Sequence, residues 1–115
     1  MNDLYIIATF FDYGEDSSSR EITVVGEQAA RGLFDKLVMR ARTPSRTDNS
    51  YVGLWKAKLS VSGTVEYVEN GELYNWVKND FRREYDYWAK HGINTKKKPF
   101  FVALEEGNMA YENLE

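Results

Sequence analysis

The first part of the chain alternates between short apolar runs and polar breaks, a pattern that predicts strands. Residues 4–11 are apolar at almost every position and rich in β-branched and aromatic side chains, as in a strand covered on both faces. Turn-forming and acidic residues fill positions 12–19, and strand character returns at 20–25. We therefore predict an antiparallel hairpin whose first strand is central in its sheet.

From residue 27 onward the apolar residues recur every three or four positions, which is the spacing of an amphipathic helix. Charged residues such as Arg31 and Asp35 fall on the other side. The spacing predicts a helix over residues 27–41. Its apolar stripe consists of Ala30, Leu33, Phe34, Leu37 and Ala41.

Residues 51–61 again alternate, with Trp55 on one face and Lys56 and Lys58 on the other. Such alternation is typical of a half-solvated strand. Ser62 and Gly63 predict a tight turn, and residues 64–69 return as the second strand of a hairpin. Pairing of a lysine with Glu66 across this hairpin would account for its charges, and Asn70 with Gly71 is expected to end the strand.

Residues 72–91 form the longest segment in which apolar residues recur at helical spacing without Gly or Pro. We predict that this segment is the main helix, followed by a short strand over residues 100–104. The stripe that would face the core consists of Tyr74, Val77, Phe81, Tyr85 and Trp88.

The opposite side of this predicted helix carries two large aromatic residues where solvent would be expected. Aromatic side chains and arginine are enriched among the residues that dominate protein interfaces. We interpret this side as the leading protein-binding surface, while packing against the first helix, the C-terminal tail or a second copy of the chain remains the alternative. The surface consists of Trp76, Asp80, Arg83 and Tyr87.

A second candidate site lies in the polar loop at residues 40–50, where Arg40, Arg42 and Arg46 occur within seven positions. Guanidinium groups bind phosphate and carboxylate through paired hydrogen bonds. An aromatic ring, Tyr51 or Trp55, would stack on a base. This site predicts a small-ligand or nucleotide-binding protein, although the composition favours a loop with no binding role that follows a basic helix C-terminus.

The predicted fold class is α+β, with one compact domain over residues 1–115 and a frayed tail after residue 107. We expect a single antiparallel sheet of about five strands, in the order ββαββαβ, covered by two helices. The order of the strands in the sheet stays open. A chain of 115 residues is near the commonest domain size.

The composition of the chain disfavours several classes of function. The formal net charge of −3 gives no overall attraction for nucleic acid, so we do not expect nucleic-acid binding. The chain contains no cysteine, which removes disulfides, thiolate metal sites and thiol nucleophiles. The absence of a leader-like start and of a long apolar run leads us to expect a cytoplasmic protein that does not enter a membrane.

Catalytic patterns are missing as well. His91 is the only histidine, and no nucleophile motif accompanies it. The carboxylates do not follow a known metal-binding spacing, although a glycosidase-like acid pair would depend on proximity that spacing does not reveal. We therefore expect a protein that is not an enzyme and uses no cofactor or metal.

A short, acidic, cysteine-free and aromatic-rich α+β chain without catalytic motifs resembles small bacteriophage-encoded accessory proteins. The resemblance is one of composition over the whole chain. Proteins of that kind commonly bind and block a host factor, including defence systems such as CRISPR effectors, or sequester a signalling nucleotide. The resemblance implies a stoichiometric, counter-defence inhibitor of a host protein that acts in the host cytoplasm, and it assigns no residue a role.

Overall fold

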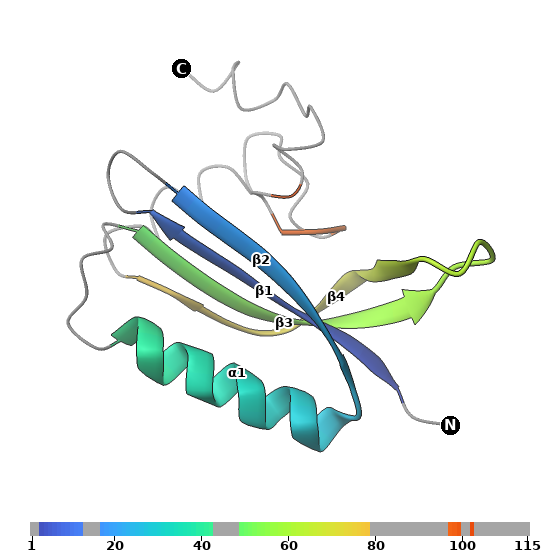
Figure 1. Cartoon of the computed structure of the whole chain (residues 1–115), viewed down its shortest axis with the longest axis horizontal. Coiled ribbons are helices and arrows are strands. Elements are labelled where there is room, and N and C mark those ends of the chain that lie inside the picture. Colours follow the sequence, from blue (N-terminus) through green and yellow to red (C-terminus); the bar gives the residue numbers. More distant parts are fainter. Residues whose placement is uncertain (1–2, 13–16, 43–48, 79–96, 100–101, 103–115) are drawn as a thin grey trace, which may run out of the picture.

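The computed structural model describes residues 3–12, 17–42, 49–78, 97–99 and 102. Within these residues the fold is α+β, as predicted: four strands form one antiparallel sheet, and one helix covers one of its faces (Figure 1). No helix in the described part of the chain is long and apolar enough to cross a membrane. The elements are β1 (Leu4–Asp12), β2 (Ser17–Val25), α1 (Glu27–Arg42), β3 (Asn49–Leu59) and β4 (Val65–Val77).

The strands lie in the order β2-β1-β3-β4. Two hairpins, β1–β2 and β3–β4, are joined where β1 pairs with β3. Leu4, for example, pairs with Val25 on one side and with Ala57 on the other. The prediction of a central first strand is therefore confirmed.

Helix α1 begins immediately after Gly26, whose φ of 94° belongs to a region that glycine enters without strain. The Gly26 amide donates to the carbonyl of Asp3 at 2.8 Å, and its carbonyl accepts from the amide of Ala30 at 3.1 Å. Gly26 thus extends the hydrogen bonding between β1 and β2 by one residue and also starts the helix. The helix predicted over residues 27–41 is confirmed and extends to Arg42.

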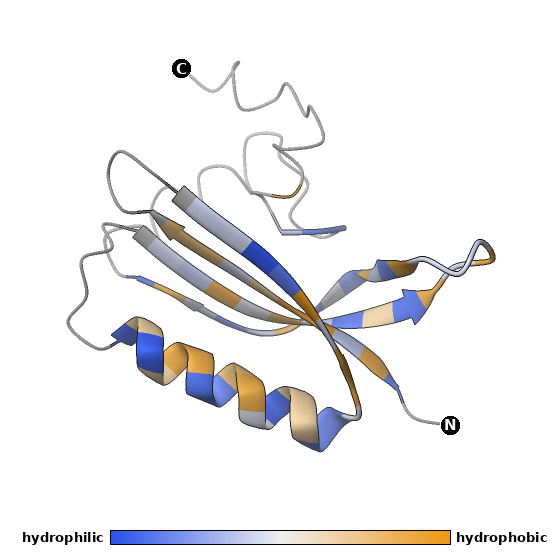
Figure 2. Ribbon diagram, in the orientation of Figure 1, coloured by the Kyte–Doolittle hydropathy of each residue, from blue (hydrophilic) through white to orange (hydrophobic). Residues whose placement is uncertain are grey.

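The face of the sheet that α1 covers, which we call the helix face, is apolar. Figure 2 shows the apolar residues of α1 recurring at helical spacing, and they pack against alternate residues of β1 and β3. Trp76 of β4 is partly buried against the same cluster. The buried members of the cluster are Tyr5, Ile7, Ala30, Phe34, Ala41, Val52 and Leu54.

The opposite face of the sheet, which we call the aromatic face, is also buried over its centre. Its buried side chains alternate along the strands with those of the helix face, as the pleat requires. The half-solvated strand predicted over residues 51–61 is therefore wrong for residues 51–55, which are all buried, and fits only from Lys56 onward. The buried residues of the aromatic face are Ile6, Ala8, Tyr51, Trp55 and Val77.

The helix predicted over residues 72–91 is wrong at its start, because β4 runs through Val77. Residues 74–77 pair with residues 51–54 of β3, and the amide of Lys78 continues the ladder by donating to the carbonyl of Ser50 at 3.0 Å. Pairing with β3 satisfies these backbone groups, and the aromatic and β-branched side chains suit a strand. Residues 79–91 lie outside the described residues.

Asn70 and Gly71 were expected to end the strand, but β4 continues through them as an irregularity. The register shifts between Leu54 and Trp55 and again between Trp55 and Ala57. Asn70 adopts a φ of 60°, and a Cβ on Gly71 would lie 2.6 Å from the carbonyl oxygen of Val68. The bulge bends the strand, and in Figure 1 the distal part of the β3–β4 hairpin extends away from the body of the sheet.

The tight turn predicted at Ser62 and Gly63 is confirmed, because Gly63 has a φ of 89° and its amide donates to the carbonyl of Ser60 at 3.0 Å. The strand predicted over residues 100–104 is described only at Val102. Val102 has helical backbone, and its amide donates to the carbonyl of Pro99 at 3.1 Å, so the predicted strand is wrong at this residue. The other residues of that predicted strand lie outside the described part.

Candidate functional site

A chain of hydrogen bonds crosses the aromatic face. The indole Nε1 of Trp55 donates to the hydroxyl of Tyr51 at 3.0 Å, and the Tyr51 hydroxyl donates to Oε2 of Glu72. The side-chain amide of Asn75 donates to the other oxygen of Glu72 at 2.7 Å. The polar atoms of two buried aromatic residues are thereby satisfied, as burial requires.

The ring of Tyr51 lies along its own strand, over Gly53. A Cβ at position 53 would lie 2.6 Å from Cζ of Tyr51, closer than nonbonded carbon atoms approach. The absence of a side chain at Gly53 is therefore what allows Tyr51 to reach both Trp55 and Glu72.

The predicted small-ligand site is not brought together as the sequence suggested. Tyr51 and Trp55 have relative exposures of 0%, so neither ring offers a surface for a base to stack on. Arg40 and Arg42 are exposed in the last turn of α1, which covers the other face of the sheet. Arg46 lies outside the described residues.

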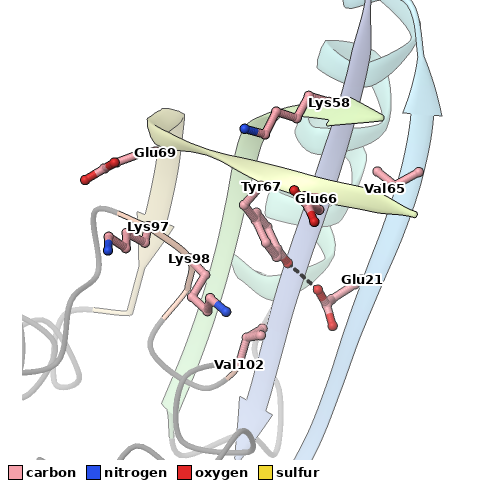
Figure 3. A pocket seen from close by; sticks show the side chains of 9 residues that line it. All are labelled: Glu21, Lys58, Val65, Glu66, Tyr67, Glu69, Lys97, Lys98 and Val102. Atoms are coloured by element: carbon pink, nitrogen blue, oxygen red, sulfur yellow. Dashed lines mark hydrogen bonds between the residues drawn. The ribbon is translucent and has the colours of Figure 1, made fainter. Parts of the chain in front are cut away.

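Tyr67 connects the two edge strands of the described sheet across the aromatic face. Its hydroxyl donates to Oε2 of Glu21 on β2 at 2.6 Å, as Figure 3 shows. Its ring meets that of Trp55 nearly edge to face, with centroids 5.2 Å apart and an interplanar angle of 77°, an arrangement favoured between aromatic rings. Tyr67 is therefore held at both its ring and its hydroxyl.

A groove with a volume of about 460 Å³ opens beside Tyr67. Sequence reasoning missed it, because its lining comes from β2, β3, β4 and residues 97, 98 and 102, which are far apart in the chain. Six of the nine lining residues are charged, three of each sign, so the groove is unlike an ordinary apolar pocket. The residues are Glu21, Lys58, Val65, Glu66, Tyr67, Glu69, Lys97, Lys98 and Val102.

A different surface lies at the boundary between α1 and β4. The guanidinium carbon of Arg31 is 4.0 Å from the ring centroid of Tyr74 and 5.8 Å from that of Phe34. Nε of Arg31 also lies 3.2 Å from Oδ1 of Asp35. Tyr74 remains 46% exposed and its neighbour Leu73 39% exposed, so an aromatic ring and an ordered arginine face outward together.

Of the four residues predicted to form the protein-binding surface, the structure describes only Trp76. It lies two positions after Tyr74 on β4, on the same face of the strand, and is half-buried against the apolar cluster. Trp76 thus belongs to a strand beside α1 rather than to the exposed side of a helix. Asp80, Arg83 and Tyr87 lie outside the described residues.

Other chemistry has less structural basis in the described part of the chain. No group of three or more histidine, aspartate or glutamate side chains there could hold a metal ion, and His91 is not among the described residues. Every buried side-chain nitrogen or oxygen in this part has a hydrogen-bond partner.

Comparison with protein-family models, with curated protein sequences and with solved structures gives no match to this chain.

Proposed function

We propose that the protein acts by binding another protein, without catalysing a reaction, through the boundary between α1 and β4. We call this region the β4–α1 surface and define it by Arg31, Tyr74 and Trp76. The observation that carries the proposal is the Arg31 guanidinium held 4.0 Å from the centroid of the exposed Tyr74 ring.

The residue types on this surface and the fixed position of the Arg31 side chain both support this role. Tyrosine, tryptophan and arginine are the types most enriched where single residues dominate binding. Arg31 is held by Asp35 and by the Tyr74 ring, so less side-chain entropy is lost when a partner covers it. Trp76 lies on the same face of β4 as Tyr74 and is half-buried, so it connects the surface to the buried apolar cluster.

The resemblance to small phage accessory proteins adds the proposed consequence of binding. A 13.4 kDa chain that covers a functional surface of a larger host protein would block it stoichiometrically. Such an inhibitor would act in the cytoplasm of the host cell. It would need no cofactor, because occupancy of the surface is the whole mechanism.

The alternative, nucleotide sequestration by the loop at residues 40–50, has weaker support. Arg40 and Arg42 are exposed and available to an anion, but Tyr51 and Trp55 are buried on the other face. Self-association through the β4–α1 surface is the other alternative, because one patch can pair with its own copy around a two-fold axis.

Native mass spectrometry of the full chain recovered from lysate of its host distinguishes these alternatives. A protein partner adds its own mass, self-association doubles the mass of the chain, and a nucleotide adds a few hundred daltons, on the order of one small ligand. We expect a foreign protein at one-to-one stoichiometry, which titration calorimetry with the purified partner would then confirm.

A pair of variants connects that result to the surface. The double variant Arg31→Ala with Tyr74→Ala should lose the partner, with affinity reduced at least about 100-fold because hot-spot residues typically contribute 2 kcal/mol or more. Leu59→Ala serves as the control, since Leu59 is 62% exposed but lies on β3 away from this surface. Retention of the partner by a folded double variant would reject the proposed surface.

A further inference from the structure

We propose that the groove beside Tyr67 binds an extended peptide segment that carries both basic and acidic side chains. The volume of about 460 Å³ falls within the range of about 300–1,000 Å³ usual for ligand sites. Small-molecule pockets are mainly apolar with a few polar groups, whereas six of the nine residues here are charged. That lining favours a charged, extended partner over a compact apolar one.

Four of the charged side chains have no partner of their own in the described part of the chain. Lys58 pairs in register with Glu66 across the β3–β4 hairpin, yet the only ion pair found among the described residues joins Arg31 to Asp35. Glu69 and Lys97 are likewise exposed and unpaired within that part. These charges are available to a ligand without breaking an existing contact.

The signs of the charges select the ligand. A polyanion would be attracted by Lys58 and Lys97 but repelled by Glu66 and Glu69. A polycation would be attracted by the two glutamates but repelled by the two lysines. Like charges placed together at an interface cost free energy and exclude wrong partners. A segment with both signs can place each charge opposite its complement, so it gains from both sets of groups.

The floor of the groove is already ordered for binding. Tyr67 is fixed by its hydrogen bond to Glu21 at 2.6 Å and by its edge-to-face contact with Trp55. In the view of Figure 3, Lys97 and Lys98 lie on one side of the groove and Val65 on the other. A peptide would therefore meet a preformed floor with charged walls, which lowers the entropic cost of binding.

This site is separate from the proposed protein-binding surface. The groove opens beside Tyr67, whose hydroxyl reaches Glu21 on β2, whereas the β4–α1 surface is formed where Arg31 of α1 meets Tyr74. The double variant Arg31→Ala with Tyr74→Ala should accordingly bind the peptide normally. Loss of the protein partner with retained peptide binding would reflect the first proposal alone, so the two can fail independently.

The test is titration calorimetry of the full chain with four tetrapeptides blocked at both ends: alternating Lys-Glu-Lys-Glu, all-Lys, all-Glu and all-Ser. Measurements at an ionic strength of about 0.01 M keep the charge interactions unscreened. We expect the alternating peptide to bind at least about tenfold more tightly than any of the other three. Equal or tighter binding of the all-Glu peptide would mean a simple anion site and would overturn the proposal, as would failure of the alternating peptide to bind.

Variants locate the binding. Glu66→Gln with Lys97→Gln should weaken the alternating peptide about tenfold, and Lys58→Gln with Glu69→Gln provides a second, independent pair of exposed positions. The matched control, Glu27→Gln with Lys36→Gln, removes one charge of each sign from exposed positions of α1 and should leave affinity unchanged. Equal weakening by the control pair, or no weakening by either groove pair, would place the binding elsewhere.

Discussion

The two faces of the sheet are buried by different kinds of interaction. On the helix face, α1 packs aliphatic side chains and Phe34 against β1 and β3, and the contacts have no required direction. On the aromatic face, Trp55 and Tyr51 are joined to Glu72 through hydrogen bonds that do require direction. The same strands therefore support a tolerant core on one side and a specific one on the other.

This difference predicts which substitutions each face should tolerate. Substitutions that preserve volume usually cost little in an apolar core. In a hydrogen-bonded chain, loss of one hydroxyl leaves buried partners unsatisfied even when the volume is kept. Variants that separate volume from hydrogen bonding should therefore distinguish the two faces.

The largest effects should come from deleting a large buried ring on either face. Trp55→Ala and Phe34→Ala should each lower the free energy of unfolding by about 3–5 kcal/mol, because Trp55 is fully buried and Phe34 only 6% exposed. Urea unfolding followed by circular dichroism measures both. A cost below about 1 kcal/mol for Trp55→Ala would show that the aromatic face contributes little to stability.

Removal of one tyrosine hydroxyl should lower the free energy of unfolding more on the aromatic face than on the helix face. Tyr51→Phe takes away the acceptor of Trp55 Nε1 and the donor to Glu72, and should cost about 1–3 kcal/mol. Tyr5→Phe on the helix face is the matched control: the Tyr5 side chain is largely buried, but its hydroxyl is not fully buried and has no hydrogen-bond partner among the described residues. Its cost should stay within about 0.5 kcal/mol, and equal costs for the two variants would remove the distinction.

At the rim of the helix face, Arg31→Ala should have a smaller effect. The contact with the Tyr74 ring is worth about 0.5–1 kcal/mol at an exposed site, and the i,i+4 pair with Asp35 about 0.3–0.5 kcal/mol. Arg31 is 46% exposed at its side chain, so the lower ends apply. Lys36→Ala, on the exposed side of the same helix, should be close to neutral when both variants are measured by urea unfolding.

The smallest predicted effect concerns the ionisation of Tyr5, which should change the stability of the protein only in alkaline solution. Burial raises the pKa of Tyr5 above its ordinary value, and the carboxylates of Glu27 and Asp3 raise it further. The neutral phenol is thus favoured in the folded chain, so its contribution is fully present below the unfolded pKa of about 10 and is lost as pH rises through the higher folded pKa. Between about pH 9 and pH 11, Tyr5→Phe should lose less stability than the unmodified chain; an identical loss would contradict this.

The parts of the fold that sequence predicted well are those encoded locally. The stripe of α1 and the apolar run of β1 each depend on neighbours within one element, and both were located within one residue of their observed bounds at one or both ends. The turn at Gly63 follows from its own conformational freedom. Local pattern and final structure agree at these positions because tertiary contacts reinforce the local preference.

The failure at residues 72–77 has the opposite cause. Tyr74 and Val77 fit a helical stripe, but Tyr74 and Trp76 also fit the two-residue alternation of a strand. Pairing with β3 decided between them, and no signal within the segment reveals that pairing. The groove was missed for the same reason: Lys58 and Glu66 were recognised as cross-strand neighbours, but their approach to Lys97 depends on the assembled chain.

The order β2-β1-β3-β4 also bears on how fast the protein folds. Each hairpin joins strands that are adjacent in sequence, so it can form early from local contacts. The seam between β1 and β3 instead joins distant positions such as Leu4 and Ala57, and α1 lies in the intervening chain. Closing that seam carries the largest loop entropy in the described sheet, so docking of the two hairpins around α1 should be the step that sets the folding rate.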